Sequence, residues 1–209
     1  MWFDWQTLNT GILALISSLI ALYSVKYRQL HLEEKEVQVA KVLLPDALVE
    51  LNDYTKKAGR VLVHALEIKN SDQYRDNTGL GMELPSRPTS HMDVISTIIR
   101  NSNDEFTKSF SIFIKKMQIF NSRLCSLEES FRPSSSCITL NVNIFDNMIL
   151  LAEIHSLIDL FFEYARDENL AKISPLIKRD SITNSFLALD IDLDNLPDLK
   201  KILDKRQPE

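Results

Sequence analysis

The sequence predicts an all-α membrane protein: an N-terminal transmembrane helix that extends into the cytoplasm, followed by an antiparallel bundle of three or four helices. Residues 5–25 contain no charged side chain. Through the rest of the chain, apolar residues recur at alternating spacings of three and four, which is the period of one helix face. Only 4 glycines occur among 209 residues, and this scarcity disfavours a β-rich fold.

The first predicted element is an uncleaved membrane anchor within residues 1–25. A helix needs about 20 mostly apolar residues to cross a hydrocarbon core of about 30 Å. A cleaved signal peptide would begin with positive charge and end at a small-residue cleavage site. Here Met1–Asp4 contain neither Lys nor Arg, and no Ala-x-Ala pattern follows the apolar run. We therefore expect the segment to remain in the protein.

The charges beside the anchor predict its direction. Lys26, Arg28 and Lys35 follow the apolar run, whereas only Asp4 and the terminal amine precede it. Because positively charged flanks are retained in the cytoplasm, we expect the N-terminus outside and the C-terminal domain in the cytoplasm.

Small residues form one face of the anchor. Gly11, Ala14, Ser18 and Ala21 are separated by three, four and three positions, and such faces let two membrane helices approach closely. One interpretation is self-association into a homo-oligomer. The alternative is that small residues are simply common in short anchors.

Residues 26–44 are predicted to continue the anchor as a juxtamembrane helix, because no Gly or Pro interrupts them. Pro45 should end or kink this helix, since proline disfavours helical geometry in the preceding residue. Residues 45–173 then form the bundle, with a loop at 70–90. The first bundle helix should end near Lys69, and its core stripe is Ala47, Leu51, Tyr54, Ala58, Val61, Ala65 and Ile68.

The middle of the bundle should contain a short helix from Ser90 to about Arg100. Two capping boxes are predicted, Ser90 with Asp93 and Ser102 with Glu105. The second favours a break near Asn101–Asp104, although one continuous helix from His91 to Phe131 is the alternative.

The next two helices have the longest repeats. One carries a seam of Phe106, Phe110, Phe113, Met117, Phe120, Leu124, Leu127 and Phe131. The other spans about Val142–Asp167, with Ile144, Met148, Leu151, His155, Ile158, Phe162 and Ala165. Sustained seven-residue repeats are typical of helices packed along their whole length. Residues 174–209 should form a tail with short helices near 182–189 and 196–203.

Several short segments of the chain recur together in one type of protein. They are Asp4–Leu8, Gly11 with Leu13–Leu15, Ala40–Leu48, Leu51–Tyr54, Arg123–Leu127 and Phe162–Arg166. With these segments the chain resembles a recurring type of bacterial single-pass membrane-anchored helical protein of unknown function. The resemblance extends to about Glu168 and implies a bacterial inner-membrane setting, but it brings no activity and no functional residues.

The residues provide little for catalysis. His155 with Asp159, and His64 with Glu67, are helical neighbours that could pair a base with a carboxylate, but pairing along one helix is the simpler interpretation. The Asp190–Asp194 run begins like a calcium loop, yet Asn195 and Lys201 occupy its glycine and glutamate positions. Gly79 and Gly81 lack a following Gly-Lys-Ser/Thr and are interpreted as loop flexibility.

Composition excludes further classes. The net charge is −5 with both signs interspersed, so there is no basic surface for nucleic acid. Cys125 and Cys137 lack metal-ligand spacing and should be free thiols in a reducing cytoplasm. We expect no enzyme activity, no cofactor and no metal.

The predicted function is therefore that of a membrane-tethered helical interaction or scaffold module. An unknown protein partner should bind at the loop of residues 71–90 or at the acidic tail of residues 190–198. The alternative is a self-associating membrane effector in a phage-defence or prophage module.

Overall fold

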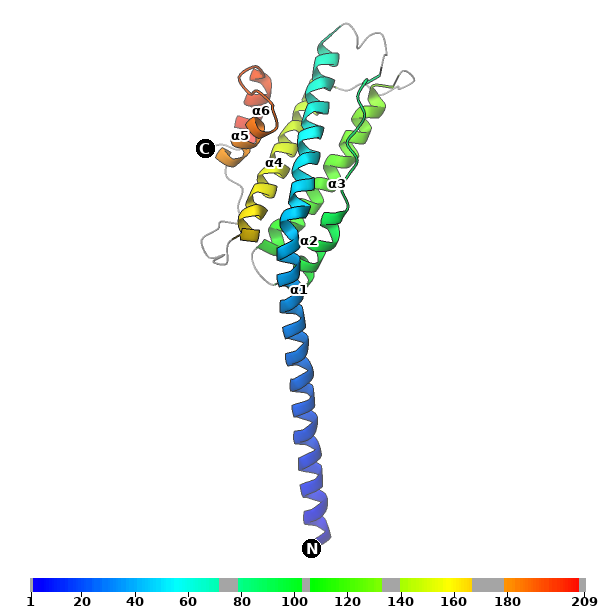
Figure 1. The fold of residues 1–209 in the computed structure, drawn as a ribbon, viewed down its shortest axis with the longest axis vertical. Coiled ribbons are helices and arrows are strands. Elements are labelled where there is room, and N and C mark those ends of the chain that lie inside the picture. The colour runs from blue at the N-terminus through cyan, green and yellow to red at the C-terminus, as the bar shows by residue number, and fades with distance from the viewer. Residues whose placement is uncertain (1, 72–78, 103–105, 133–139, 167–178, 207–209) are drawn as a thin grey trace.

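The computed structural model describes residues 2–71, 79–102, 106–132, 140–166 and 179–206. In this part of the chain all regular structure is helical: α1 (Trp2–Asn70), α2 (Ser90–Asn101), α3 (Phe106–Ser130), α4 (Asn141–Arg166), α5 (Arg179–Ala188) and α6 (Pro197–Arg206). The all-α prediction is thus confirmed. A long single helix projects from a compact helical body (Figure 1).

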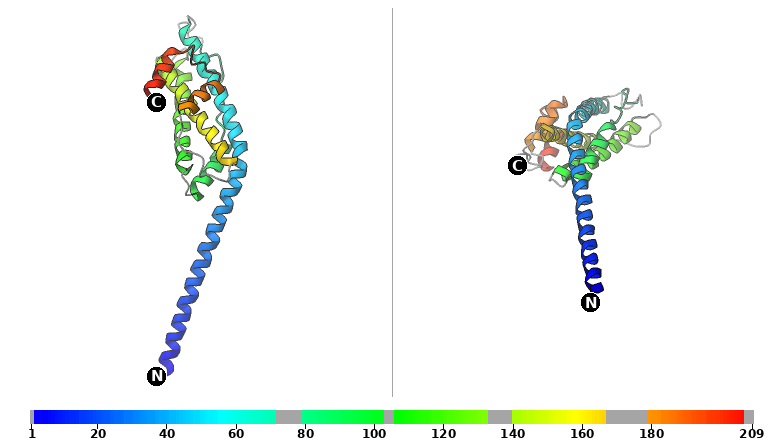
Figure 2. Two further views of the ribbon diagram at one scale, coloured as in Figure 1. Left: turned by 90° about the vertical axis from the view of Figure 1, so that its left-hand side faces the viewer. Right: turned by 60° about the horizontal axis from the view of Figure 1, so that its bottom comes forward.

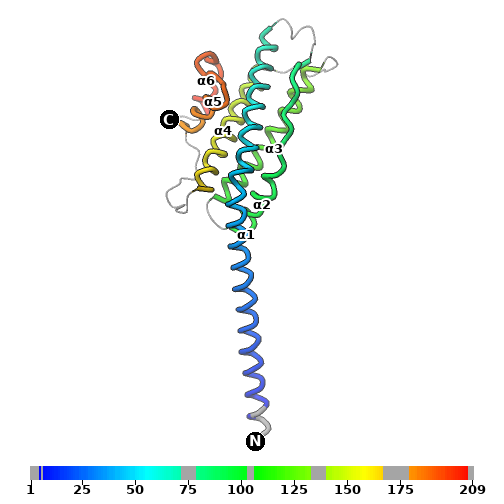
Figure 3. The backbone as a smooth tube through the Cα atoms, in the orientation of Figure 1, coloured from blue at the N-terminus to red at the C-terminus, as the bar shows by residue number. Residues whose placement is uncertain are grey.

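Helix α1 is unbroken over 69 residues, which corresponds to a length of about 100 Å at 1.5 Å per residue. Pro45 lies inside it, so of the two predicted outcomes, an end or a kink, the helix end is excluded. A proline removes one hydrogen bond and crowds the preceding turn, but buried Leu44 and Leu48 pack on either side and hold the chain helical. The backbone stays continuous (Figure 3) and changes direction where it enters the body (Figure 2, left).

The body consists of the C-terminal half of α1 with α2, α3 and α4 (Figure 1). Polar contacts show the relative directions of α1 and α2. The Asn101 amide donates to the Glu36 carboxylate over 2.6 Å, and the Ser90 hydroxyl donates to Glu50. The later end of α2 therefore contacts the earlier part of α1.

Helices α3 and α4 also run in opposite directions. The rings of Phe106 and Tyr164 lie 4.8 Å apart, and those of Phe110 and Phe161 lie 4.0 Å apart in a stacked arrangement. Stacked and tilted aromatic pairs add about 0.5–1.5 kcal/mol to the burial of their area. The aromatic-rich seam of α3 is therefore paired mainly with α4.

The seam predicted for α3 is confirmed, because all eight of its residues are buried. The seam predicted for α4 is confirmed only as far as Ile158. Beyond it, Phe161 and Tyr164 are buried, whereas Phe162 and Ala165 are only partly buried. Helix α4 contacts α1, α3 and α5, so its buried surface is wider than one seam and includes Phe161 and Tyr164.

The start of α2 differs from the prediction. Thr89 is the N-cap residue and makes no side-chain capping bond. The Ser90 hydroxyl instead bonds Glu50 on α1, so the predicted Ser90–Asp93 capping box is wrong. Ser102 is extended after the end of α2, which confirms the break and excludes a continuous helix. Glu105 of the second capping box lies outside the described residues.

Residues 79–89, here called the strap, are non-helical and run along α1 and α3 (Figure 1). Leu80 is buried and Leu84 packs against the core. Gly79 and Gly81 have φ values of +79° and +65°, a conformation that side chains with a Cβ rarely adopt. Backbone geometry therefore favours glycine at both positions, a reason that the interpretation as loop flexibility did not include.

Helices α5 and α6 confirm the predicted short helices of the tail and pack against α4. Gly59 of α1 lies beneath the turn that follows α5. A Cβ at this position would lie 3.2 Å from the carbonyl oxygen of Leu189 and 3.8 Å from Leu151. The absence of a side chain at Gly59 thus lets this turn approach α1 closely.

Candidate functional site

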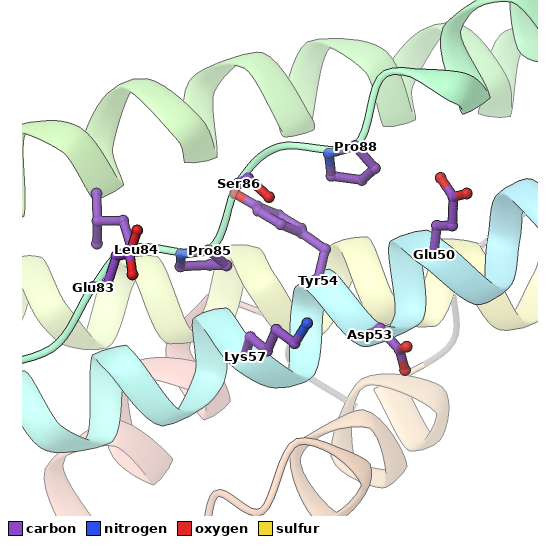
Figure 4. Close-up of a pocket in the computed structure, with 9 residues that line it drawn as sticks. All are labelled: Glu50, Asp53, Tyr54, Lys57, Glu83, Leu84, Pro85, Ser86 and Pro88. Atoms are coloured by element: carbon purple, nitrogen blue, oxygen red, sulfur yellow. The ribbon is translucent and has the colours of Figure 1, made fainter.

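A groove of about 580 Å³ lies between α1 and the strap (Figure 4). The strap contributes two prolines, whose fixed φ favours an extended backbone. Helix α1 contributes polar side chains one turn apart. The lining residues are Glu50, Asp53, Tyr54, Lys57, Glu83, Leu84, Pro85, Ser86 and Pro88.

Tyr54 crosses from α1 toward the strap near Ser86 (Figure 4) and is buried. Its hydroxyl donates a short hydrogen bond to Asn121 Oδ1 on α3, and its ring meets Phe120 edge-on at 6.4 Å. Burial raises the pKa of Tyr54 to about 12, although nearby Arg87 opposes the shift. Tyr54 is therefore a neutral phenol that fixes one side of the groove, and it is unsuited to act as a base at neutral pH.

The charges around the groove are mainly negative. Glu50, Asp53 and Glu83 supply three carboxylates, and Lys57 supplies one ammonium group. The Arg87 guanidinium near Tyr54 adds a second positive charge. Glu50 already accepts the hydrogen bond from Ser90, whereas Asp53 and Glu83 are exposed. Complementary potentials favour association and select partners. The groove therefore suits an extended segment that carries positive charge.

His155 is the centre of the most enzyme-like cluster in the described chain. Its Nδ1 lies 3.3 Å from Ser185 Oγ and 3.4 Å from Asp159 Oδ2. A Ser-His-Asp triad needs the serine and the carboxylate on opposite ring nitrogens, but here both lie at the same one. Ser185 is buried and donates its hydroxyl to the Ser181 carbonyl over 2.8 Å. The cluster therefore attaches α5 to α4.

The other predicted polar pairs are local. His64 Nδ1 lies 3.6 Å from Glu67, as expected for neighbours along one helix. Asp192 accepts a hydrogen bond from the Asp194 backbone amide at 2.9 Å. Within the described residues, no group of three or more His, Cys, Asp or Glu side chains could hold a metal ion.

His91 is a buried group whose surroundings are not evident from the sequence. It is fully buried on α2, and neither ring nitrogen has a hydrogen-bond partner. Its ring meets Phe113 edge-on at 6.3 Å. Burial lowers the pKa of His91 to about 4, assisted by Arg87 and opposed by Glu50. The side chain is therefore neutral at pH 7.

The predicted association face lies on the exposed part of α1. Gly11, Ala14, Ser18 and Ala21 are all exposed, and a Cβ at Gly11 would meet no atom within 4 Å. The Ser18 hydroxyl donates to the Ala14 carbonyl over 2.8 Å, so its hydrogen-bonding requirement is met within the helix. Self-association through this face stays a prediction.

The apolar N-terminal part of α1 is long enough to cross a membrane. An 18-residue window has a mean hydropathy of 1.8, and none of it is buried. Cys125 is a free thiol on the surface of α3, as predicted, while Cys137 lies outside the described residues.

Comparison with known proteins leaves the predicted resemblance to bacterial membrane-anchored proteins as a prediction. No protein-family model, curated protein or solved structure matches this chain.

Proposed function

We propose that this protein is a non-catalytic, membrane-tethered scaffold, with residues 5–25 in a bacterial inner membrane and an antiparallel helical bundle in the cytoplasm. One observation carries the proposal: α1 runs without a break from the exposed apolar segment to the groove. A single helix therefore joins the proposed anchor to the proposed binding surface.

The exposure of the anchor supports membrane insertion. Large aliphatic side chains such as Leu13, Leu15 and Leu22 are more than 60% exposed. In water this surface would be unfavourable, at roughly 25 cal/mol per Å² of apolar area. A bilayer removes that cost, and Lys26 and Arg28 beyond the apolar segment favour a cytoplasmic body.

The occupant that we propose for the groove is an extended, basic segment of a partner protein. Asp53 and Glu83 provide exposed negative charge on α1 and on the strap, while buried Tyr54 and the prolines keep the groove open. Because no triad geometry and no metal-ligand group occur in the described chain, binding accounts for the groove better than chemistry does.

Cross-linked pull-down from bacterial membranes tests this function. We expect the full chain to capture a partner that is lost when Asp53→Lys and Glu83→Lys are combined. The matched control combines Glu129→Lys with Glu163→Lys, two exposed positions away from the groove, and should retain the partner. Recovery of only the protein itself, or equal capture by both double variants, would contradict the proposal.

Orientation is tested separately by a C-terminal reporter that is active only outside the cytoplasm. We expect no signal from this fusion and a strong signal when the reporter is attached at the N-terminus. The reverse pattern would overturn the proposed topology.

A membrane effector is the second candidate, and the open surface at Gly11 favours it, because small residues permit close helix assembly. Overexpression with a membrane-potential dye distinguishes the two candidates. A scaffold should leave the potential intact, whereas an effector assembly should collapse it.

A further inference from the structure

The part of α1 between the apolar segment and the body, residues 26–39, is here called the rod. None of its residues is buried in the described structure, and the first buried residue of α1 is Ala40. Its length is about 20 Å. Isolated helices shorter than about 12–15 residues are marginal in water, and most helices are stabilised by packing of an apolar face. The rod therefore lacks within one chain the contacts that usually stabilise a helix.

An aliphatic seam follows one side of the rod and enters the body. It consists of Val25, Leu32, Val39, Val42 and Val49, which are spaced by seven, seven, three and seven positions and are 64%, 61%, 60%, 77% and 53% exposed. All five lie at a or d positions of a heptad repeat, the pattern that packs two helices together. The opposite side of the same helix is buried in the body.

The body leaves this seam free. Ala40, Leu44 and Leu51 are buried on the other side of α1, where α2 and α4 contact it. A second helix lying on the seam would therefore meet α1 without displacing α2 or α4, and the two bodies would point away from each other.

The seam also continues in register into the apolar segment. Gly11, Ala14, Ser18 and Ala21 precede Val25 at spacings of three, four, three and four, so they occupy the same heptad positions. Five of the eight seam positions from Val25 to Val49 are aliphatic, as in a coiled coil. The residues in the proposed anchor are small, as close packing in a membrane requires.

We infer that a second copy of this chain covers the seam as a parallel two-stranded coiled coil that extends from the anchor to Val49. This inference is independent of what the groove binds. Two copies inserted in one membrane share orientation and height, so the pairing is parallel and unstaggered. In that register Lys35 of one copy lies beside Glu36 of the other, and this charge complementarity is repeated by the two-fold symmetry.

The pairing should be moderate in strength. Arg28, Lys35 and Asp46 occupy three seam positions, where each faces the same residue of the other copy, and charged residues there cost stability while they specify register and oligomer state. The aliphatic stems of Arg28 and Lys35 can cover apolar surface while the charged ends reach water. Insertion of both copies in one membrane raises their effective concentration. The dimer should therefore form in membranes and dissociate on dilution into detergent.

Cysteine cross-linking in isolated membranes tests the seam. In a full chain that carries Cys125→Ser and Cys137→Ser, we compare Leu32→Cys on the seam with Leu30→Cys, which is 50% exposed on another face. Oxidation should yield at least about fivefold more disulfide-linked dimer at position 32, because symmetric seam positions come within disulfide distance. Equal yields, or no dimer at position 32, would overturn the inference.

A further pair of variants tests whether the seam, and not the anchor alone, holds the two copies together. Val39→Asp, added to the Leu32→Cys chain, should reduce the linked dimer severalfold, whereas Leu30→Asp should leave it unchanged. Thermal unfolding by circular dichroism should show the same body transition in both variants, since both positions are exposed. An undiminished dimer in Val39→Asp would overturn the seam. Failure of partner capture by the full chain would leave this result unaffected and would refute only the proposed function.

Discussion

The two halves of α1 belong to one helix, but they differ in how their apolar side chains are covered. From residue 5 to residue 39, no described side chain is buried. From residue 40 to residue 70 the helix buries a continuous stripe against α2 and α4. The covalent chain and the hydrogen-bonding pattern are the same, so the surroundings alone distinguish the halves.

This difference separates two sources of stability. In the second half, the free energy of unfolding depends on side chains that fit one another, because core packing is dense and sensitive to volume. In the first half, it depends on a medium or a partner that the single chain does not contain. The same substitution should therefore have different consequences in the two halves.

Leucine truncation should give the largest contrast. Leu51→Ala should lower the free energy of unfolding of the body by about 2–5 kcal/mol, because it leaves a cavity at a fully buried position. Leu19→Ala should leave that quantity unchanged, since Leu19 is 57% exposed. Urea denaturation of both variants in detergent checks the pair, and equal losses would refute the proposed separation.

A charge placed in the apolar segment should affect membrane insertion and leave the stability of the body unchanged. Leu15→Arg should make membrane insertion less favourable by about 2.5–3.5 kcal/mol, the cost of arginine at the centre of a membrane helix. The thermal transition of the body should not change. Membrane fractionation compares this variant with Leu15→Ala, which should remain membrane-bound.

Acid should destabilise the body, which includes the second half of α1, through His91 on α2. Its pKa is about 4 in the folded chain and about 6.5 when unfolded, so the unfolded state binds the proton first as pH falls. Stability is fully present above pH 6.5 and decreases by about 3 kcal/mol toward pH 4. His91→Phe should remove most of this loss, whereas His64→Gln at a more exposed position should retain it. Unfolding at a series of pH values measures both.

The two glycines within α1 give the smallest expected contrast. Gly59→Val should cost about 1–3 kcal/mol, because a Cβ at Gly59 would lie 3.2 Å from the Leu189 carbonyl oxygen. Gly11→Val should leave the body unaffected, since nothing lies within 4 Å there. A thermal shift of the body in Gly11→Val alone would contradict the assignment of the two environments.

Much of the fold could be predicted from periodicity. The seam from Phe106 to Phe131 repeats over seven turns, and every member is buried. Such a repeat is predictive because many positions agree on one face, so that no single residue decides the result. Single-residue signals were less informative. Pro45 favours a break, but the packing of Leu44 and Leu48 overrides it. The Ser90–Asp93 pattern favours a cap, but Glu50 from another helix takes the Ser90 hydroxyl.

The groove could be predicted only in part. The loop of residues 71–90 was expected to contribute a binding surface, and the strap within it does line the groove. The roles of Tyr54 and Asn121 depend on a contact between α1 and α3, and a helical period gives no information on which residues meet across two helices. The proximity of Ser185 to His155 could not be predicted for the same reason, since 30 positions separate them in the chain.

The continuity of α1 also gives the rod a geometric meaning. At 1.5 Å per residue, the groove begins about 40 Å beyond residue 25, which would be well outside the lipid headgroups if residues 5–25 cross a membrane as we propose. Each residue added to or removed from the rod turns the helical body by about 100° around the anchor axis, since an α-helix has 3.6 residues per turn. Seven added residues nearly restore the azimuth and raise the groove by about 10 Å. The length of the rod thus sets both the distance of the groove from the anchor and the direction in which the groove faces around the anchor axis.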